Sequence, residues 1–551
     1  MSRKPAAEHY EENRRRILGK ETCNQPVSEH GIFEIILASP REYSYAMSSL
    51  AFQSVYQQLV SWPETYCERS FFPVLDEYHW RSRYNHPTIT LETGKSIKEC
   101  DLLVFTPSKE ADYIRILQMM SLSDIKLRAE NRIDKWPLVI ASGISVTANP
   151  MPLSLFMDAF VIGETEPSLG PVLDTIKSLG AQGASKKKLL RRLATLPGMY
   201  IPSVHEIPGK VNSIMRQWAG SEGMGSKSCI TSSECARGET IMLEISRGCP
   251  YNCKFCQLGY VSLPYRECKL EDIEESIRNL PDIDRLTILG SSPRSHPDLR
   301  KMIKTAEKLY SEVLLDSNKT EELTLLFPEN TLILAPETGT DSLRKIIGKK
   351  LSNSMMFESV EKHSKNNVKG IIIHFMLGLP FETDSDRKGI LDFVSEVRNR
   401  TSLPIYVSVN PFIPKPWTAF QWSAMAGSTD LREWIKELVA GIKRLKKVSI
   451  EYEEPRNAHI MALLARGDHR TSYALEEKLS GVGWNTAFKR AGISIRWVLE
   501  ELDTETSFEW DFLNMGFGHT RLAREYQSSF TGHQNRIKSL EKDTEKTETA
   551  K

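Results

Sequence analysis

Three of the nine cysteines of this chain lie within eight residues, in the segment SRGCPYNCKFCQLG at residues 246–259. Cys249, Cys253 and Cys256 follow one another at spacings of four and three. A structural zinc site commonly uses four ligands in two separated pairs, whereas the next cysteine, Cys268, stands alone. A disulfide would leave one thiol over. Three thiolates hold an iron–sulfur cubane and leave one iron open, and that iron can bind a small chelating ligand.

The composition sets limits on the compartment and the partners. The chain has 551 residues, which predicts two to four domains. The net charge of +1 gives no sign of general nucleic-acid or membrane-surface binding. No apolar run approaches the roughly 18 residues that span a bilayer, and the polar N-terminus lacks the apolar stretch of a secretory signal. We expect a cytoplasmic protein whose thiols stay reduced.

Four short apolar runs with helical patterns between them predict a Rossmann-like parallel sheet in the first part of the chain. The runs are residues 32–40, 100–107, 136–143 and 158–164, and residues 45–60 have helical spacing. Ligands of such sheets bind beyond the carboxyl ends of the strands. The loops there are residues 39–44, 106–110, 142–149 and 163–166. They are candidates for a ligand site, although they could serve only to turn the chain.

A change of composition separates this sheet from a second one. The segment SKKKLLRRL predicts a basic, solvated helix, and the Gly/Ser-rich stretch around Cys229 and Cys235 predicts a linker with unpaired thiols. Six apolar runs then alternate with helical patterns and predict a partial (β/α)6 barrel of the TIM type. They are residues 240–246, 285–290, 312–317, 331–336, 369–378 and 404–411. The cysteine loop directly follows the first of them.

The expected class is therefore α/β with a mainly helical C-terminal extension. The predicted divisions are a polar N-terminal segment (1–30), the Rossmann-like domain (31–180), a linker (181–235), the barrel (236–427), the helical extension (428–535) and a charged, disordered tail (536–551).

The cysteine motif, with the aromatic Phe255 before its last thiol, resembles that of the radical S-adenosylmethionine (SAM) superfamily. The resemblance implies a [4Fe-4S] cluster on Cys249, Cys253 and Cys256. Its open iron would chelate SAM, and reductive cleavage would give a 5′-deoxyadenosyl radical. It also implies an external electron donor such as flavodoxin or ferredoxin, and protein groups that place the cofactor and exclude water.

Further segments are similar to the family's SAM-binding motifs and imply cofactor-binding residues. Gly290, Ser291 and Ser292 match by place the contact to the methionine amino group, although the usual G-G-E letters are absent. Glu337 and Arg344 match charged positions near the ribose and carboxylate; alternatively, Glu337 caps a helix and Arg344 pairs with it. Gly378 matches a glycine that lets the backbone approach adenine, and Glu382 is expected to start the next helix.

Residues 32–527 resemble a radical SAM subfamily with an N-terminal cobalamin-binding-type domain. That resemblance implies cobalamin as a further cofactor and methyl transfer to an unactivated carbon as the reaction. The D-x-H-x-x-G motif that supplies a cobalt ligand is absent, because His30, His79 and His86 stand in other contexts. Cobalamin would then bind without a protein histidine, or the domain would be a remnant.

Two other hypotheses remain open. In the first, the enzyme works without cobalamin, catalyses a rearrangement, oxidation or sulfur insertion, and uses its N-terminal domain to recognise a substrate or partner. Sulfur insertion commonly needs an auxiliary cluster, and the nearest spare thiols are Cys229, Cys235 and Cys268. In the second, the protein is a non-catalytic adaptor with a structural cluster or zinc, which predicts no cleavage of SAM.

The substrate is a small molecule or a protein side chain, and the sequence does not identify it. In residues 410–422, Lys415, Trp417 and Gln421 are candidates to touch substrate, with packing as the alternative for Trp417 and the expectation for Trp422. In the segment ARGDHR we expect Asp468 to be held in a helix-capping turn by a neighbouring arginine.

Overall fold

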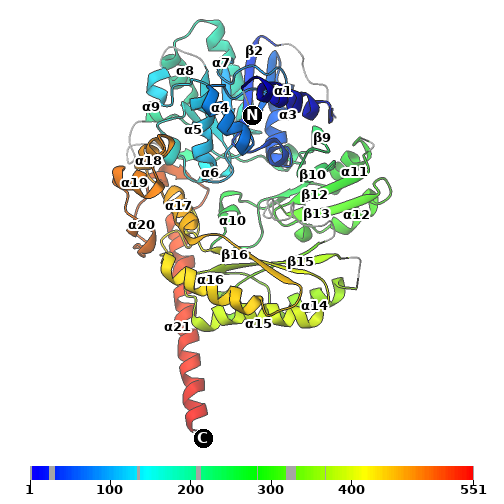
Figure 1. Ribbon diagram of the computed structural model, residues 1–551, viewed down its shortest axis with the longest axis vertical. Coiled ribbons are helices and arrows are strands. Elements are labelled where there is room, and N and C mark those ends of the chain that lie inside the picture. The colour runs from blue at the N-terminus through cyan, green and yellow to red at the C-terminus, as the bar shows by residue number, and fades with distance from the viewer. Residues whose placement is uncertain are drawn as a thin grey trace.

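The computed structural model describes residues 3–23, 31–132, 137–205, 213–281, 283–317, 331–365 and 368–549. The N-terminal part lies above two further sheets, and C-terminal helices cover one side of the molecule (Figure 1). The predicted α/β class, with parallel sheets and a helical C-terminal region, is confirmed. No helix in the described part of the chain is both long and apolar enough to cross a membrane.

The N-terminal sheet has six strands in the order β3-β2-β4-β5-β6-β7, of which only β7 is antiparallel to its neighbour. The strands are β2 (Phe33–Ser39), β3 (Thr65–Phe71), β4 (Leu102–Phe105), β5 (Leu138–Ser142), β6 (Ala159–Val161) and β7 (Met199–Tyr200). The predicted runs become β2, β4, β5 and β6. The five parallel strands have the order of flavodoxin-like sheets, in which the chain reverses direction beside the first strand and ligands bind at that switch point. Here the switch point lies between β2 and β4.

Strand β3 was not predicted, because its sequence TYCERSF is half polar. Its Glu68 and Arg69 are nonetheless buried. Arg69 contacts Glu21 and Glu92, each at 2.7 Å, so charges from distant segments stabilise the burial. The predicted helix at residues 45–60 is interrupted, giving α2 (Tyr43–Ala46) and α3 (Leu50–Ser61).

The N-terminal segment and the predicted linker are both structured where they are described. Helix α1 (Arg3–Leu18) leads to β1 (Glu21–Cys23), which pairs with β9 (Ile230–Ser232). The basic helix α8 (Lys186–Leu193) is amphipathic rather than fully solvated, since its three leucines are buried. Described residues of the predicted linker therefore pack with the N-terminal part through α8 and β9. The remaining helices of this part are α4 (Leu75–Tyr84), α5 (Asp112–Leu122), α6 (Ile144–Ala148), α7 (Leu169–Ala181) and α9 (Pro202–His205).

The six predicted barrel strands are all present, but they form two sheets. The first sheet has the order β11-β10-β12-β13 and the second β14-β15-β16-β17. Within the described residues β13 and β14 do not pair. The bounds are β10 (Ile241–Arg247), β11 (Arg266–Glu267), β12 (Arg285–Gly290), β13 (Glu312–Ser317), β14 (Thr331–Glu337), β15 (Gly370–Leu377), β16 (Ile405–Pro411) and β17 (Val448–Tyr452). Strand β17 falls in the predicted helical extension and extends the second sheet.

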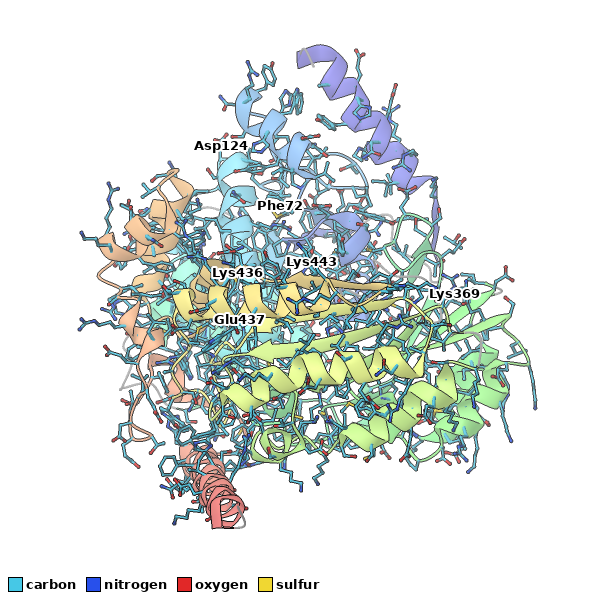
Figure 2. All side chains as sticks on the ribbon, turned by 60° about the horizontal axis from the view of Figure 1, so that its bottom comes forward. Phe72, Asp124, Lys369, Lys436, Glu437 and Lys443 are labelled. Carbon is cyan, nitrogen blue, oxygen red and sulfur yellow. The ribbon has the colours of Figure 1, made fainter. Side chains whose placement is uncertain are left out.

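Helices cover the outer faces of these sheets. On α16 (Ser428–Ile442), Leu431, Ile435, Leu438 and Ile442 are buried against the second sheet, whereas Lys436 and Glu437 lie on its exposed side (Figure 2). The other helices of this region are α10 (Gln257–Val261), α11 (Leu270–Arg278), α12 (Leu299–Ala306), α13 (Asp341–Ile346), α14 (Asn353–His363) and α15 (Asp384–Arg400).

The C-terminal extension consists of α17 (Pro455–Ala465), α18 (Arg470–Leu479), α19 (Trp484–Arg490), α20 (Arg496–Leu499) and α21 (His519–Thr549). Two short strands, β8 (Ile214–Met215) and β18 (Leu513–Asn514), tie it to the N-terminal part. Helix α21 continues to Thr549 and projects from the molecule (Figure 1). The backbone there is helical, in contrast to the predicted disordered tail at 536–551, because its residues are charged helix formers that continue an existing helix.

Candidate functional site

The cysteine loop begins directly after β10, in a turn that only glycine can make. Gly248 has φ +80°, and a Cβ there would lie 2.6 Å from the Ser262 carbonyl oxygen and 2.7 Å from that of Pro264. The chain therefore turns sharply between β10 and the first thiol. Cys249 and Cys253 are buried and Cys256 is half-buried, at the start of α10.

Three other parts of the chain hold this loop. The Lys254 amide donates to the Ile347 carbonyl at 2.9 Å, and the Lys254 carbonyl accepts from the Phe420 amide at 3.2 Å. The Lys254 ammonium donates to Ser529 of α21 at 2.8 Å. Gly348, with φ +76°, passes so close that a Cβ would lie 2.5 Å from the Asn252 carbonyl oxygen. The loop is thus fixed before any cofactor binds, which favours a preorganised site.

The donor set of the loop fits an iron–sulfur cubane. Three cysteine thiols lie within eight residues, whereas a structural zinc site commonly takes four ligands. Three thiolates leave one iron of a cubane without a protein ligand.

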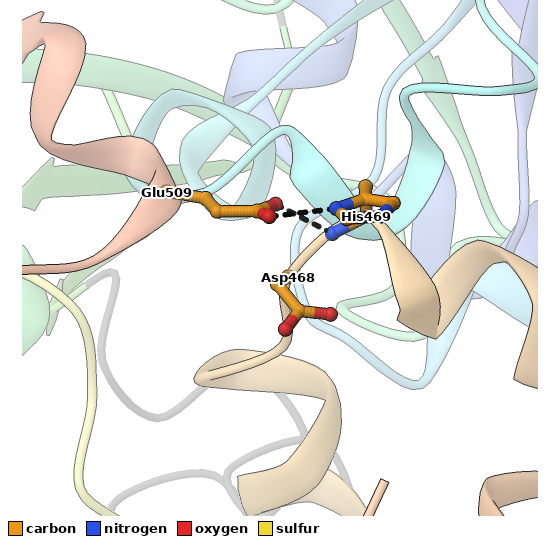
Figure 3. Close-up of side chains that lie close together, drawn as sticks. All are labelled: Asp468, His469 and Glu509. Carbon is orange, nitrogen blue, oxygen red and sulfur yellow. Dashed lines mark hydrogen bonds and ion pairs between the residues drawn. The ribbon is translucent and has the colours of Figure 1, made fainter. Parts of the chain in front are cut away.

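A group of possible metal ligands gathers within 4.8 Å at Asp468, His469 and Glu509 (Figure 3). Its members already have partners. The His469 Nδ1 lies 2.6 Å from Glu509, and Asp468 accepts from the Arg470 amide and guanidinium, each at 2.9 Å. These bonds start α18, as expected of a capping turn, and the structure places no open donor set here.

The predicted contacts to the methionine amino group follow β12. Gly290 ends that strand, and a Cβ there would lie 2.5 Å from the Ser246 hydroxyl. Ser291 is buried and lines a large cavity. Ser292 is half-buried and lies 2.8 Å from the Ser295 hydroxyl. The structure thus brings Ser291 to a ligand-sized space and gives Ser292 a partner within its own turn.

The charged candidates after β14 differ in their surroundings. Glu337, with φ +64°, ends the strand and accepts a hydrogen bond from Lys349 at 2.5 Å. Arg344 is fully buried and donates to Asn353, and burial lowers its pKa. Arg344 therefore makes structural contacts, but its main partner is Asn353 rather than Glu337. The backbone of Glu337 adopts an uncommon conformation, which often marks a functional site.

The glycine after β15 is held by the residue expected to begin the next helix. Gly378 has φ +74°, and its amide donates to Glu382 Oε2 at 2.9 Å. Glu382 precedes α15 and closes this turn instead of capping the helix, where Thr383 and Asp386 form the capping box. Burial raises the pKa of Glu382 to about 7. Both Gly378 and Glu382 line a cavity of about 280 Å³ next to Trp434.

The aromatic and polar candidates for substrate contact pack the domains together. Phe255 is partly buried against the large core cluster. The Trp417 indole is buried and donates to the Ala148 carbonyl at 3.0 Å, and Gln421 accepts from the Trp417 amide at 2.8 Å. Lys415 pairs with Glu110 at 2.6 Å. Trp422 is fully buried, as expected. The structure therefore gives packing roles to the candidates from 410–422.

A cavity of about 400 Å³ lies between the N-terminal sheet and the first barrel sheet. All four predicted loops contribute to its wall, with Ser39, Thr106, Gly143 and Gly163 among the residues. The barrel side contributes the end of β10, Ser291, and two residues of the helix after Cys256, Leu258 and Val261. The ligand edge of the N-terminal sheet therefore shares one space with the surroundings of the cysteine loop.

An ion network crosses the boundary of the two domains at this cavity. Arg247, the last residue of β10, lies 3.0 Å from Glu164, 2.9 Å from Glu166 and 2.8 Å from Glu244. Arg266 also contacts Glu164 at 2.6 Å. Burial raises the pKa of Glu164, but the Arg266 hydrogen bond and the Arg247 charge outweigh burial, and the pKa falls below its ordinary value. No sequence pattern indicated this network, because its members come from separate strands and loops.

The cavity gives no support for cobalamin. No histidine stands among the described residues that line it. Ion pairs between Arg247 and Glu164 join the two domains at this cavity. Gly143 and Gly163 are approached by the chain's own backbone, since a Cβ would lie 2.2 Å from the Pro107 oxygen and 2.1 Å from the Gln217 oxygen. Their small size thus serves the fold.

His374 is a further residue that the sequence did not indicate. Its neighbours Ile373 and Phe375 pack outward against helices, so the imidazole lies on the opposite face of β15. Its Nε2 is buried without a hydrogen bond, and burial lowers the pKa of the ring. The nearby charge of Glu337 raises this pKa and that of Lys349 lowers it. A single histidine in a strand carries no periodic signal, so only the structure could reveal this grouping.

Comparison with known proteins agrees with the cysteine loop. Residues 243–394 match the model described as the radical SAM superfamily, and residues 51–202 match the model of radical SAM proteins, N-terminal. The second match is to a radical SAM N-terminal domain and gives no support for cobalamin binding.

Relatives extend the comparison. The uncharacterized protein MJ0966 of Methanocaldococcus jannaschii is 26% identical over 408 residues, 73% of this chain and 85% of the relative. The ribosomal protein uS12 methylthiotransferase RimO of Clostridioides difficile is 24% identical over 185 residues, 28% of this chain and 40% of the relative. The [FeFe]-hydrogenase maturase HydG is a solved structure with a TM-score of 0.26, 13% identity, and coverage of 41% of this chain and 54% of that one. On the two family matches, the chain belongs to the radical SAM superfamily.

Proposed function

We propose that this protein cleaves SAM reductively at a [4Fe-4S] cluster on Cys249, Cys253 and Cys256, and that its N-terminal domain binds the substrate. One observation supports substrate binding by the N-terminal domain: the cavity of about 400 Å³ is lined by residues of both domains and reaches the loop after β12. A substrate bound there would lie beside the position expected for SAM.

The chain's own residues have defined tasks in this proposal. Gly248 turns the chain between β10 and the first thiol, and Gly348 and Lys254 hold the loop. Leu258 and Val261 give the cavity an apolar wall that excludes water. Cys249, Cys253 and Cys256 would hold the cluster, which with bound SAM and one electron from an external donor would supply a 5′-deoxyadenosyl radical for hydrogen abstraction next to the substrate.

Cobalamin-dependent methylation, the finer hypothesis, has less support than a cobalamin-free reaction. The cavity lacks a histidine among its described lining residues, and the ion pairs of Arg247 occupy the boundary of the domains. We therefore propose that the N-terminal domain recognises a substrate directly.

Sulfur insertion is less favoured, although one relative is a methylthiotransferase. Cys229 and Cys235 pack in the core of the N-terminal sheet, whereas Cys268 packs in the core of the first barrel sheet. These spare thiols therefore do not form one auxiliary site.

Anaerobic reconstitution with iron and sulfide tests the proposal. The reduced protein should convert SAM to methionine and 5′-deoxyadenosine, and Cys253→Ala should lose the cluster absorption and this activity. Cys268→Ala, a buried cysteine outside the motif, is the matched control and should keep both. A reconstituted wild-type protein that holds its cluster but never cleaves SAM would favour a non-catalytic adaptor. Co-elution of added hydroxocobalamin at one per chain would restore the methylation hypothesis.

A further inference from the structure

We propose that the cavity between the domains binds the phosphate group of a small phosphorylated substrate, at the switch point of the N-terminal sheet. This inference rests on the proposed function for the identity of the ligand as substrate. It names the chemical class of that substrate and the residues that hold its charged end.

The topology places the site. Ligands of sheets with this strand order bind where the connections diverge, beyond the carboxyl ends of the first and third strands. Here these ends are Ser39 of β2 and the residues after β4, Thr106 to Ser108. All of them line the cavity, together with Arg41 from the loop after β2.

The first turn of α3 lies at the same space. Ser49, Leu50, Ala51 and Phe52 line the cavity. The Gln53 amide makes the first intrahelical bond, to the Ser49 carbonyl at 3.2 Å, so the preceding amides lie before the helical ladder. The Ser49 side chain makes no capping bond to them. A helix of 12 residues with its N-terminus at a cavity favours an anion.

A buried cation is the independent second sign of an anionic ligand. Arg216 lines the cavity, is 2% exposed, and its Nε has no hydrogen-bond partner. Its Nη2 donates to the Leu263 carbonyl, its guanidinium lies 5.2 Å from the Trp218 ring centroid, and its charge interacts with those of Glu164 and Arg266. Burial nevertheless lowers the pKa of Arg216 to about 10, so these partners do not fully compensate the buried cation, and a ligand anion would add the missing charge.

The carboxylates in the wall do not oppose an anion at the switch point. Glu164, Glu166 and Glu244 are all paired with Arg247, at the β6 and β10 end of the cavity. At the β2 and β4 end, Arg41 lies 3.7 Å from Asp112, whose Oδ2 accepts from the Ser108 amide at 2.8 Å. These carboxylates therefore already have cationic partners, so they oppose an anion at α3 less than free carboxylates would.

Leu50 shows how the two ends connect. This first-turn residue of α3 packs against Met242 of β10 and Leu289 of β12. A ligand anchored by phosphate at α3 would thus extend toward Ser291, which lines the same cavity and follows β12. The volume of about 400 Å³ lies within the range of small-molecule sites.

Titration of the full-length reconstituted protein with methyl phosphate, followed by 31P NMR line broadening, tests this inference. Ala51→Glu places a carboxylate at the exposed first turn of α3 and should weaken binding at least tenfold, while Ala51→Gln of similar size should bind within about twofold of wild type. Arg41→Gln should also lose at least tenfold. Arg115→Gln is its control, because Arg115 lies outside the cavity wall and stacks on Phe72.

Three outcomes would overturn the inference: no binding to the wild type, equal binding to Ala51→Glu, or displacement of methyl phosphate by SAM, which would assign the anion site to the carboxylate of SAM. Cleavage of SAM is measured in the same preparations. Phosphate binding without cleavage would contradict the proposed function alone, and cleavage without phosphate binding would contradict this inference alone.

Discussion

The guanidinium Nη1 of Arg247 lies 3.0 Å from Oε2 of Glu164, so an ion pair joins the strand that leads into the cysteine loop to the ligand edge of the N-terminal sheet. Both side chains are largely buried. The two domains are therefore coupled at the place where cofactor and substrate would meet. A movement of one ligand edge would be transmitted to the other through Arg247.

Glu164→Gln should destabilise the protein more than the neighbouring change Glu166→Gln. Glu164 pairs with both Arg247 and Arg266 and accepts from the Ala219 amide at 2.7 Å, whereas Glu166 shares Arg247 with two other carboxylates. Loss of the charge at 164 leaves two buried guanidinium groups short of a partner, at a cost of about 2–3 kcal/mol. Urea unfolding measures the difference. Equal losses in the two variants would show that Glu164 does not hold the domains.

Gly348→Ala should displace the cysteine loop. The methyl group of alanine would lie 2.5 Å from the Asn252 carbonyl oxygen, and the alanine backbone would have to keep φ +76°. Gly183→Ala is the matched control, since Gly183 has φ +63° with no atom within 4 Å of its Cβ position. Both variants bear the cost of a left-handed alanine, about 1 kcal/mol, but only Gly348→Ala should lose iron. The measurement is the iron content per chain after reconstitution. Equal iron content in the two variants would mean that the cysteine loop does not depend on the contact with Gly348.

The local patterns predicted the strands and the cysteine loop because their signals lie within a few residues. Apolar runs such as 312–317 became strands with the expected bounds. Strand β3 was not predicted because its charged residues Glu68 and Arg69 are typical of exposed positions. They are buried only because distant residues such as Glu21 and Glu92 pair with Arg69 in the fold. Arg344 has a local partner in Asp341, three residues earlier on its own helix, at 3.4 Å. Its hydrogen bond to Asn353, nine residues later, depends on how the chain turns after α13.

Trp417→Phe separates packing from substrate contact. The substitution removes the indole donor to the Ala148 carbonyl and leaves that buried oxygen unpaired, which should cost about 1–2 kcal/mol. Trp422→Phe, whose indole bond to Thr506 is longer at 3.4 Å, should cost less. Uncoupled SAM cleavage should stay within about twofold of wild type in both. A large drop in cleavage by Trp417→Phe with unchanged stability would return this residue to the active site.

Glu382 should make stability depend on pH between its unfolded and folded pKa values. Burial raises the pKa from 4.5 to about 7, so between these values the native protein holds a proton that the unfolded chain has released. The free energy of unfolding should therefore fall as pH rises from about 4.5 to about 7, and the effect should be constant above that range. Glu382→Gln removes this pH-dependent contribution to the free energy of unfolding. Its stability relative to wild type should rise over the same interval by up to about 3 kcal/mol.

Glu358→Gln, which removes an exposed carboxyl on α14, is the charge control. Parallel pH profiles for wild type and Glu382→Gln, measured by urea unfolding, would mean that the Glu382 carboxyl in the Gly378 turn does not stay protonated between pH 4.5 and about 7.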